Sequence, residues 1–217
     1  MMRIRKHSKH RSAVKFIGKF PSLKLNRTVL WGSQLVRDFL YLLEFDPDVL
    51  SYREQPMQLD YVHNSVQYGY IPSFLVKRSK NQQIIEVKSE EQLGSEAATI
   101  KYRLIASILR QEGYDFYVVT DKTIRVQPRL DNIKFLWKYA RTPITPQHQI
   151  LCHNLMRRNH DVAFSEVVQF FESHHAPRQV VYALMYRGAF TFDLMQPIDS
   201  KTILQLSAIA LADKKVS

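Results

Sequence analysis

Residues 70–76 read YIPSFLV and residues 83–88 read QIIEVK, with the polar stretch RSKN at 78–81 between them. Both runs have strand length and are rich in β-branched and aromatic residues, so they predict a β-hairpin that turns at RSKN. Successive side chains of a strand point to opposite faces, which places Glu86 and Lys88 on the same face. The hairpin therefore presents a carboxylate beside an ammonium group.

This arrangement is typical of metal-dependent nucleases, whose acids bind Mg²⁺ while a lysine orients water or stabilises phosphate charge. Their pattern is Pro-Asp, a spacer, and then an acid, any residue and Lys. Here Pro72 precedes Ser73 instead of an aspartate, whereas Glu86 and Lys88 match the second half. Glu-x-Lys is also common on ordinary solvated strand faces, so this match needs support from the rest of the chain.

The composition favours a nucleic-acid partner. The chain has 217 residues, which suits one large domain or two small ones, and a net charge of +11 with a pI of about 9.7. Such a balance favours polyanions, because basic side chains neutralise phosphates and release their counterions. We expect no membrane span or signal peptide. A single cysteine, Cys152, excludes an internal disulfide and indicates a reducing compartment such as the cytoplasm.

Residues 1–28 contain no acid, and we expect them to form a basic arm that lies along DNA phosphates. The alternative is a terminus that only adds solubility. The candidate DNA-binding residues of the arm are Arg3, Arg5, Lys6, Lys9, Arg11, Lys15, Lys19 and Lys24.

Residues 29–141 predict an α/β domain with a mixed sheet and flanking helices. In chain order we expect a helix from Ser33 to Phe45, strands over 49–52, 57–62 and 66–71, the hairpin, a helix over 95–113, a buried parallel strand over 114–120, and a helix capped by Asp131. The apolar stripe of the long helix consists of Ala97, Ile100, Leu104, Ile105 and Ile108. Lys101 and Arg103 lie off this stripe and are further candidates for DNA binding.

The stretch TPITP at 142–146 predicts a linker, and residues 146–217 predict a second, smaller domain. Three short helices, a strand over 189–194 and a final helix through Leu204 are similar to a winged-helix module. We expect Cys152 to lie in the core of this domain. The histidines at 148, 153, 160, 174 and 175 lack the spacing of a metal site, so we expect them to pack or to face solvent.

Five sequence blocks in a fixed order point to one family: SQLVRDFLYLLEFD at 33–46, YREQP at 52–56, PSFLV at 72–76, EVK at 86–88 and VVTDK at 118–122. Over residues 19–206 the chain resembles TnsA, the endonuclease subunit of heteromeric transposases. The resemblance implies a restriction-endonuclease-like core followed by a winged-helix-like C-terminal domain. It also implies double-stranded DNA at transposon ends as the ligand, with Mg²⁺-dependent nicking of the 5′ strands. The implied partners are a TnsB-like DDE transposase, which cuts and joins the 3′ ends, and a TnsC-like AAA+ regulator, which binds the C-terminal region.

The resemblance implies four functional positions, of which two depart from the family. Val36 stands where the family has a glutamate, and Ser73 where it has a metal-binding aspartate. Glu86 and Lys88 are retained. Because serine is a neutral ligand and valine is none, we expect a degenerate nuclease centre, with at most weak metal binding at Glu86 and no cofactor. Mg²⁺ remains the implied cofactor if the centre is active.

Two alternatives stay open. The chain can be a working Mg²⁺ or Mn²⁺ endonuclease in which Glu54, Asp60, Glu90 or Glu91 replaces a missing acid, whereas Asp38 lies half a turn from Val36 on the wrong helix face. It can also be a basic adaptor that docks partner proteins and binds no DNA at the old site.

Overall fold

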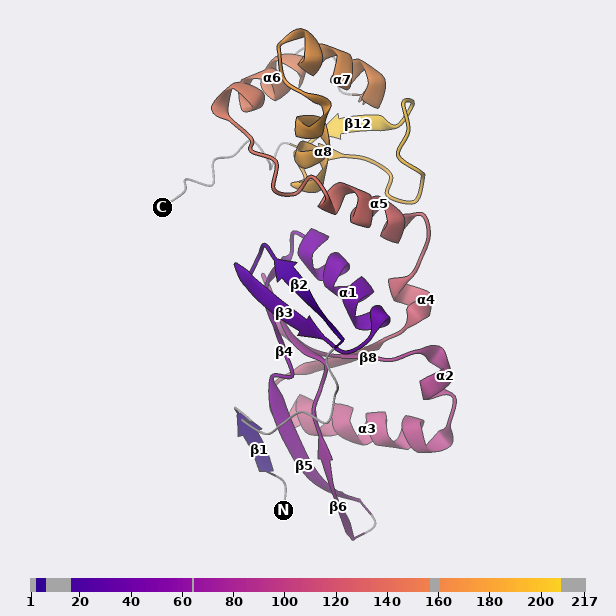
Figure 1. The fold of residues 1–217 in the computed structure, drawn as a ribbon. Helices are drawn as coiled ribbons and strands as arrows, with labels where there is room; N and C mark the ends of the chain where they lie inside the picture. Colours follow the sequence, from indigo (N-terminus) through magenta and orange to yellow (C-terminus); the bar gives the residue numbers. More distant parts are fainter. Residues whose placement is uncertain (1–2, 7–16, 64, 157–160, 208–217) are drawn as a thin grey trace. The chain divides into compact units, whose positions relative to one another are not determined.

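The structure, a computed structural model, describes residues 3–6, 17–63, 65–156 and 161–207 (Figure 1). The chain divides into two compact units, 1–125 and 126–217, which are described separately. The boundary between the units lies before the predicted linker at 142–146. Helix α5 (Arg129–Trp137) belongs to the second unit because it packs against helix α8 (Arg178–Tyr186). The rings of Phe135 and Tyr182 make this contact, with centroids 4.9 Å apart.

A four-stranded mixed sheet forms the centre of the first unit, with the strand order β4-β7-β8-β9. Its strands are β4 (Val49–Glu54), β7 (Phe74–Arg78), β8 (Gln82–Val87) and β9 (Asp115–Val119). The predicted hairpin is confirmed, since β7 pairs antiparallel with β8 and Phe74 lies opposite Ile85. β9 pairs parallel with β8, as predicted. The fold is thus the mixed α/β type that the sequence indicates.

Helix α1 (Gln34–Phe45) begins after Ser33, whose hydroxyl accepts a 3.1 Å hydrogen bond from the backbone N–H of Val36. This is the predicted N-cap. Its apolar side packs on the sheet, where the rings of Phe39 and Phe74 lie 5.7 Å apart. Two single-turn helices, α2 (Glu90–Leu93) and α4 (Asp121–Ile124), follow β8 and β9.

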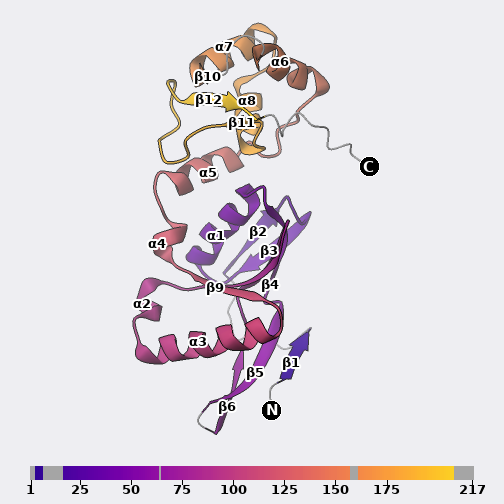
Figure 2. The ribbon, with the colours of Figure 1, turned by 180° about the vertical axis from the view of Figure 1, so that it is seen from behind.

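Helix α3 (Glu96–Gln111) lies along β9 (Figure 2). Its residues Ile105, Ile108 and Leu109 are buried against Leu59 and Ile84. The predicted stripe is wrong at its N-terminal end, where Ala97 is exposed and Ile100 is 43% exposed, because the packed face begins only further along the helix. The predicted burial of β9 is also wrong: among the described strands it pairs only with β8, and Tyr117 is 49% exposed.

Two further strand groups precede and flank this core. The strands β1 (Arg3–Lys6), β5 (Met57–His63) and β6 (Val66–Tyr70) form a sheet in the order β1-β5-β6, and β2 (Gly18–Ser22) pairs with β3 (Arg27–Trp31). The predicted arm over 1–28 therefore overlaps a folded hairpin. Lys9, Arg11 and Lys15 lie outside the described residues.

The second unit combines helices with a small antiparallel sheet in the order β10-β12-β11. Its remaining elements are α6 (Pro146–Met156), β10 (Asp161–Ala163), α7 (Phe164–Ser173), β11 (Phe190–Thr191) and β12 (Ile203–Leu206). Cys152 is buried, as predicted.

Three predictions for this unit need correction. The predicted final helix is wrong, because residues 203–206 form β12, in which exposed Ile203 precedes buried Leu204 as strand alternation requires. The predicted strand over 189–194 is limited to β11. Helix α5 begins at Arg129 after Pro128, so Asp131 lies in its first turn and is not its cap. Within the part of the chain that the structure describes, none of the helices combines the length and apolarity needed to cross a bilayer.

Candidate functional site

A hollow of about 480 Å³ in the first unit brings together Val36, Ser73, Glu86 and Lys88. The start of α1 contributes Ser33 and Val36, the end of β4 contributes Glu54 and Gln55, and α3 contributes Lys101. Ser73 precedes β7, and Glu86 and Lys88 come from the end of β8. All four positions that the sequence singled out for the nuclease centre therefore line one cavity.

The hairpin register explains why Ser73 meets Glu86. Phe74 lies opposite Ile85, so the residue before Phe74 faces the residue after Ile85. Strand alternation then returns Lys88 to the face of Glu86, and its Nζ atom lies 3.6 Å from Glu86 Oε1. This agrees with the predicted placement of the two side chains on one face.

The Glu86 carboxylate accepts several hydrogen bonds inside the protein. Its Oε2 atom accepts from the Tyr70 hydroxyl at 3.0 Å, from the Ser73 backbone N–H at 2.9 Å and from the Ser73 hydroxyl at 3.0 Å. The Ser73 Oγ atom in turn accepts from the backbone N–H of Val87 at 3.1 Å, so its own proton points to Glu86. Glu86 is only 4% exposed. Burial, followed by the charge of Glu86, raises the pKa of Tyr70, which keeps its phenol protonated as a donor.

This donor set does not fit Mg²⁺. That ion requires near-octahedral oxygen ligation, usually with carboxylates among the ligands. Here one carboxylate oxygen already accepts three donors, the other faces the Lys88 ammonium, and Val36 supplies no ligand atom. Among the described residues, no group of three or more His, Cys, Asp or Glu is placed to hold a metal ion.

The acids considered as replacements have other partners. Glu54 lines the hollow, but both of its carboxylate oxygens bind the Arg27 guanidinium, at 2.7 and 2.6 Å. Asp60 accepts from Gln58 at 2.7 Å and, like Glu90 and Glu91, is not among the lining residues.

Glu90 and Asp38 each pair with a basic side chain. The Glu90 carboxylate lies 3.3 Å from the Lys122 ammonium. Asp38 is not among the lining residues either, and Arg125 donates to it at 2.8 Å.

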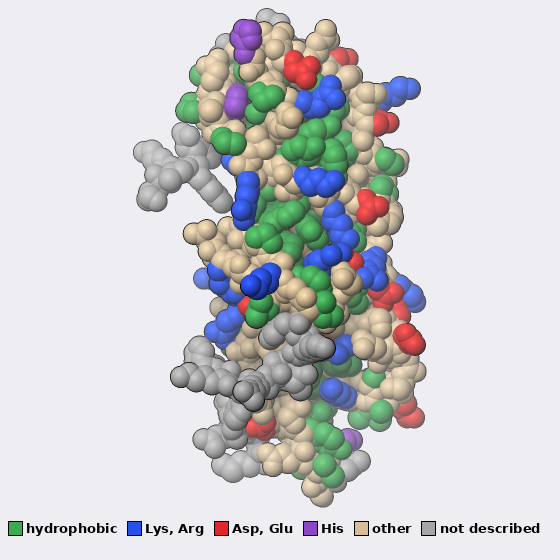
Figure 3. Space-filling model, viewed as in Figure 1, with side chains coloured by type: hydrophobic (Ala, Val, Ile, Leu, Met, Phe, Trp, Pro, Cys, Tyr) green, Lys and Arg blue, Asp and Glu red, His purple; other side chains and the backbone are tan. Residues whose placement is uncertain are grey.

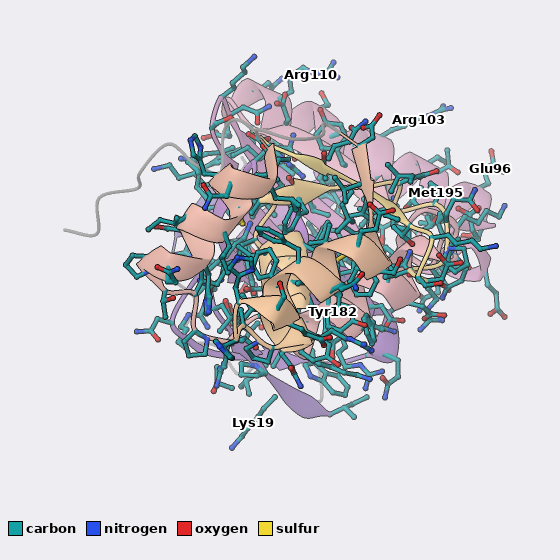
Figure 4. The ribbon with its side chains drawn as sticks, turned by 90° about the horizontal axis from the view of Figure 1, so that it is seen from above. Lys19, Glu96, Arg103, Arg110, Tyr182 and Met195 are labelled. Atoms are coloured by element: carbon teal, nitrogen blue, oxygen red, sulfur yellow. The ribbon has the colours of Figure 1, made fainter. Side chains whose placement is uncertain are left out.

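The candidate DNA-binding cations separate into different surroundings. Lys101 lines the hollow, with its ammonium 5.3 Å from the ring centroid of Tyr70 and 5.5 Å from that of Tyr102. Arg103 is two positions further along α3, about 200° around the helix, and points outward in Figure 4. Lys19 also points outward, whereas the Lys24 ammonium donates to the backbone carbonyls of residues 46 and 49.

The basic side chains on one face of the molecule are dispersed. Lys and Arg side chains are scattered among hydrophobic and polar side chains on the face shown in Figure 3. Only the backbone of β1 is described, so the role of Arg3, Arg5 and Lys6 in DNA binding remains a prediction.

A comparison with protein-family models matched residues 46–121 to the family described as TnsA-like endonuclease N terminal. Residues 46–121 form a TnsA-like endonuclease N-terminal domain. The match contains Ser73, Glu86, Lys88 and Lys101, whereas Val36 lies before it. It implies a restriction-endonuclease-like fold for the mixed sheet described above. A search of curated proteins gave no match.

Two residues of the candidate site were not predicted from the sequence. Tyr70 opens the predicted strand run YIPSFLV and was given no role in the site, yet its hydroxyl donates to Glu86. Gln55 lines the hollow with a backbone φ of 45°, a left-handed conformation that non-glycine residues seldom adopt. The sequence signal for Gln55 was its place in the YREQP block. No local sequence pattern indicates that the Tyr70 hydroxyl lies within hydrogen-bond distance of Glu86.

Proposed function

We propose that this TnsA-like chain is a DNA-binding subunit of a heteromeric DNA transposase that acts at transposon ends and carries a degenerate nuclease centre. The observation that supports this most strongly is the contact between Ser73 and Glu86. A hydroxyl and a backbone N–H occupy the carboxylate oxygen that would otherwise be available to a metal ion. The site thus retains the lysine and the hollow of a nuclease but lacks a second carboxylate in a usable position.

The chemistry of strand cleavage explains why this matters. Hydrolysis of a phosphodiester needs an activated water and stabilisation of the charge that develops on the phosphate. Lys88 can supply part of the second requirement. Among the described residues that line the hollow, neither carboxylate is free to activate a water, because Glu86 is buried and accepts hydrogen bonds and Glu54 is paired with Arg27. The proposed subunit holds DNA without cutting it.

The proposed partners follow from the family and from the second unit. Double-stranded DNA suits the net charge of +11. We propose that the chain bridges a TnsB-like DDE transposase and a TnsC-like AAA+ regulator, the latter through a winged-helix-like C-terminal domain. The helices and the small antiparallel sheet of residues 126–217 support that assignment of fold.

A transposition assay tests the proposal. With no 5′ nicking, only the 3′ strands are cut and joined, so an element that relies on this protein should give cointegrates. Lys88→Ala should leave the product distribution unchanged. Simple insertions that disappear in Lys88→Ala would show that the centre cleaves DNA.

A second candidate, an active endonuclease, is favoured by one observation: Glu54 lines the same hollow as Glu86. For Glu54 to act, it must leave its paired bonds to Arg27. This alternative predicts Mn²⁺-dependent nicking of the 5′ strand that Glu54→Gln abolishes and Arg27→Ala increases. The degenerate site predicts no nicking by any of these proteins.

A further inference from the structure

We infer that the hollow binds a DNA backbone phosphate directly, without a divalent ion, and that Lys88 and Lys101 supply the positive charge. This inference rests on the proposed function and names the ligand of the same site. It differs from metal-assisted binding because the ammonium groups of the protein, and not a divalent ion, neutralise the charge of the phosphate.

The charges around the hollow support this. Its charged lining residues are Glu54, Glu86, Lys88 and Lys101. The Arg27 guanidinium neutralises Glu54 through two hydrogen bonds. Two ammonium groups then remain against the single carboxylate of Glu86, which leaves one net positive charge. A phosphodiester carries one negative charge, so the hollow is complementary to it with no ion present.

The hydrogen bonds of Glu86 reduce its repulsion of such a phosphate. Three donors from Tyr70 and Ser73 converge on Oε2 and stabilise part of the negative charge of the carboxylate. The other oxygen lies 3.6 Å from the Lys88 ammonium, which is longer than a charged hydrogen bond. The Lys88 side chain is 35% exposed, so its ammonium can approach a phosphate while it remains beside Glu86.

Lys101 is held where a phosphate can reach it. Its ammonium lies against the rings of Tyr70 and Tyr102, an arrangement that favours this position of a flexible side chain. The residue itself is exposed. A lysine positioned before the ligand arrives loses less side-chain entropy on binding, so its contribution to affinity is larger.

The backbone of Gln55 is an independent indication that the hollow is built for a ligand. Its φ of 45° is unfavourable for a residue with a side chain, and such conformations concentrate at binding sites. The Gln55 N–H donates to the carbonyl of Ser73 at 3.0 Å, which ties the end of β4 to the wall of the hollow. Gln55 is itself one of the residues that line the hollow.

The test is a titration of a transposon-end duplex with the full chain. Fluorescence anisotropy measures the dissociation constant in EDTA and in Mg²⁺ at equal ionic strength. Wild-type affinity should be the same in the two buffers within about twofold, since no ion is needed. Lys101→Ala should weaken binding about tenfold in both buffers and lower the salt slope by about one. Arg103→Ala is the matched control, because it removes one exposed charge from the same helix on a face away from the hollow. It should change affinity less than about twofold, a small fraction of the loss of a charged contact.

The outcomes separate the inference from the function on which it rests. Wild-type binding that rises about tenfold or more with Mg²⁺, or equal losses in Lys101→Ala and Arg103→Ala, would overturn the direct phosphate contact while leaving DNA binding intact. A wild-type chain that fails to bind the duplex in either buffer would overturn both the inference and the proposed function. Lys88→Ala provides a second variant, for which we expect a loss in the same direction as for Lys101→Ala.

Discussion

Replacing Ser73 with alanine tests the hydrogen-bond network of the candidate site. The Ser73 hydroxyl donates to the buried carboxylate of Glu86 at 3.0 Å and accepts from the N–H of Val87 at 3.1 Å. A hydrogen bond to a charged group contributes about 1.5–3 kcal/mol, and an N–H left without an acceptor costs about 1–3 kcal/mol. Water in the open hollow can replace part of both. We therefore expect the first unit to lose about 2–3 kcal/mol of unfolding free energy.

The assay is equilibrium urea unfolding followed by tryptophan fluorescence. The chain has two tryptophans, Trp31 in the first unit and Trp137 in the second, so a Trp137→Phe background makes the signal specific for the first unit. Ser79→Ala is the matched control. Ser79 follows the same strand that Ser73 precedes and also donates to a carboxylate, that of Asp48, but its bond is exposed. We expect no measurable change for this control.

Equal unfolding free energies of Ser73→Ala and Ser79→Ala would refute this expectation. That result would mean that the Ser73 hydroxyl is not held between Glu86 and Val87, and that the carboxylate oxygen remains available to other ligands. A change in the urea m-value without a change in midpoint would instead report an altered unfolded state.

Three other predictions concern protonation and metal binding. Ser73→Asp places a second carboxylate beside Glu86, so the substitution should lower the stability of the first unit at pH 8 and lower it less near pH 5. Mg²⁺ should raise the melting temperature of this variant but not that of the wild type. A variant whose melting temperature is insensitive to Mg²⁺ would contradict the proposed geometry. Burial raises the pKa values of Tyr52 and Tyr70, so these phenols keep protons that the unfolded chain loses above about pH 10. Stability of the first unit should therefore fall as pH rises above that value, by up to about 1.4 kcal/mol per pH unit for each tyrosine, and a constant urea midpoint from pH 9 to 11 would oppose this. Burial also raises the pKa of the Cys152 thiol to about 12. Iodoacetamide at pH 8 should therefore label this thiol at least about a hundredfold more slowly in the folded chain than in the unfolded chain. Equal labelling rates would argue against a buried thiol.

Local patterns in the sequence were sufficient for the elements that hold the site. Alternating side chains and a polar turn predicted the hairpin, and the same alternation placed Glu86 beside Lys88. Ser33 predicted the start of α1, because an N-cap needs only a hydroxyl and the next turn of backbone. These features depend on residues that are close in the chain, which is why one sequence suffices to find them.

Features that depend on distant contacts were not accessible in this way. The predicted final helix through Leu204 is wrong because a short apolar run has no clear period, and the pairing of β12 with two other strands decides its structure. The Arg27 pairing with Glu54 joins residues from different strands, so the sequence left Glu54 open as a replacement acid. Likewise, Lys101 and Arg103 looked equivalent as basic residues, and only the packing of α3 places one of them at the hollow.

Strand cleavage tests the central claim most directly. End-labelled transposon-end DNA is incubated with this protein, its transposase partner and Mg²⁺ or Mn²⁺, and each strand is analysed on a denaturing gel. The account predicts cleavage of the 3′ strand by the transposase and an intact 5′ strand. A 5′ nick that requires this protein and is lost in Lys88→Ala would contradict it.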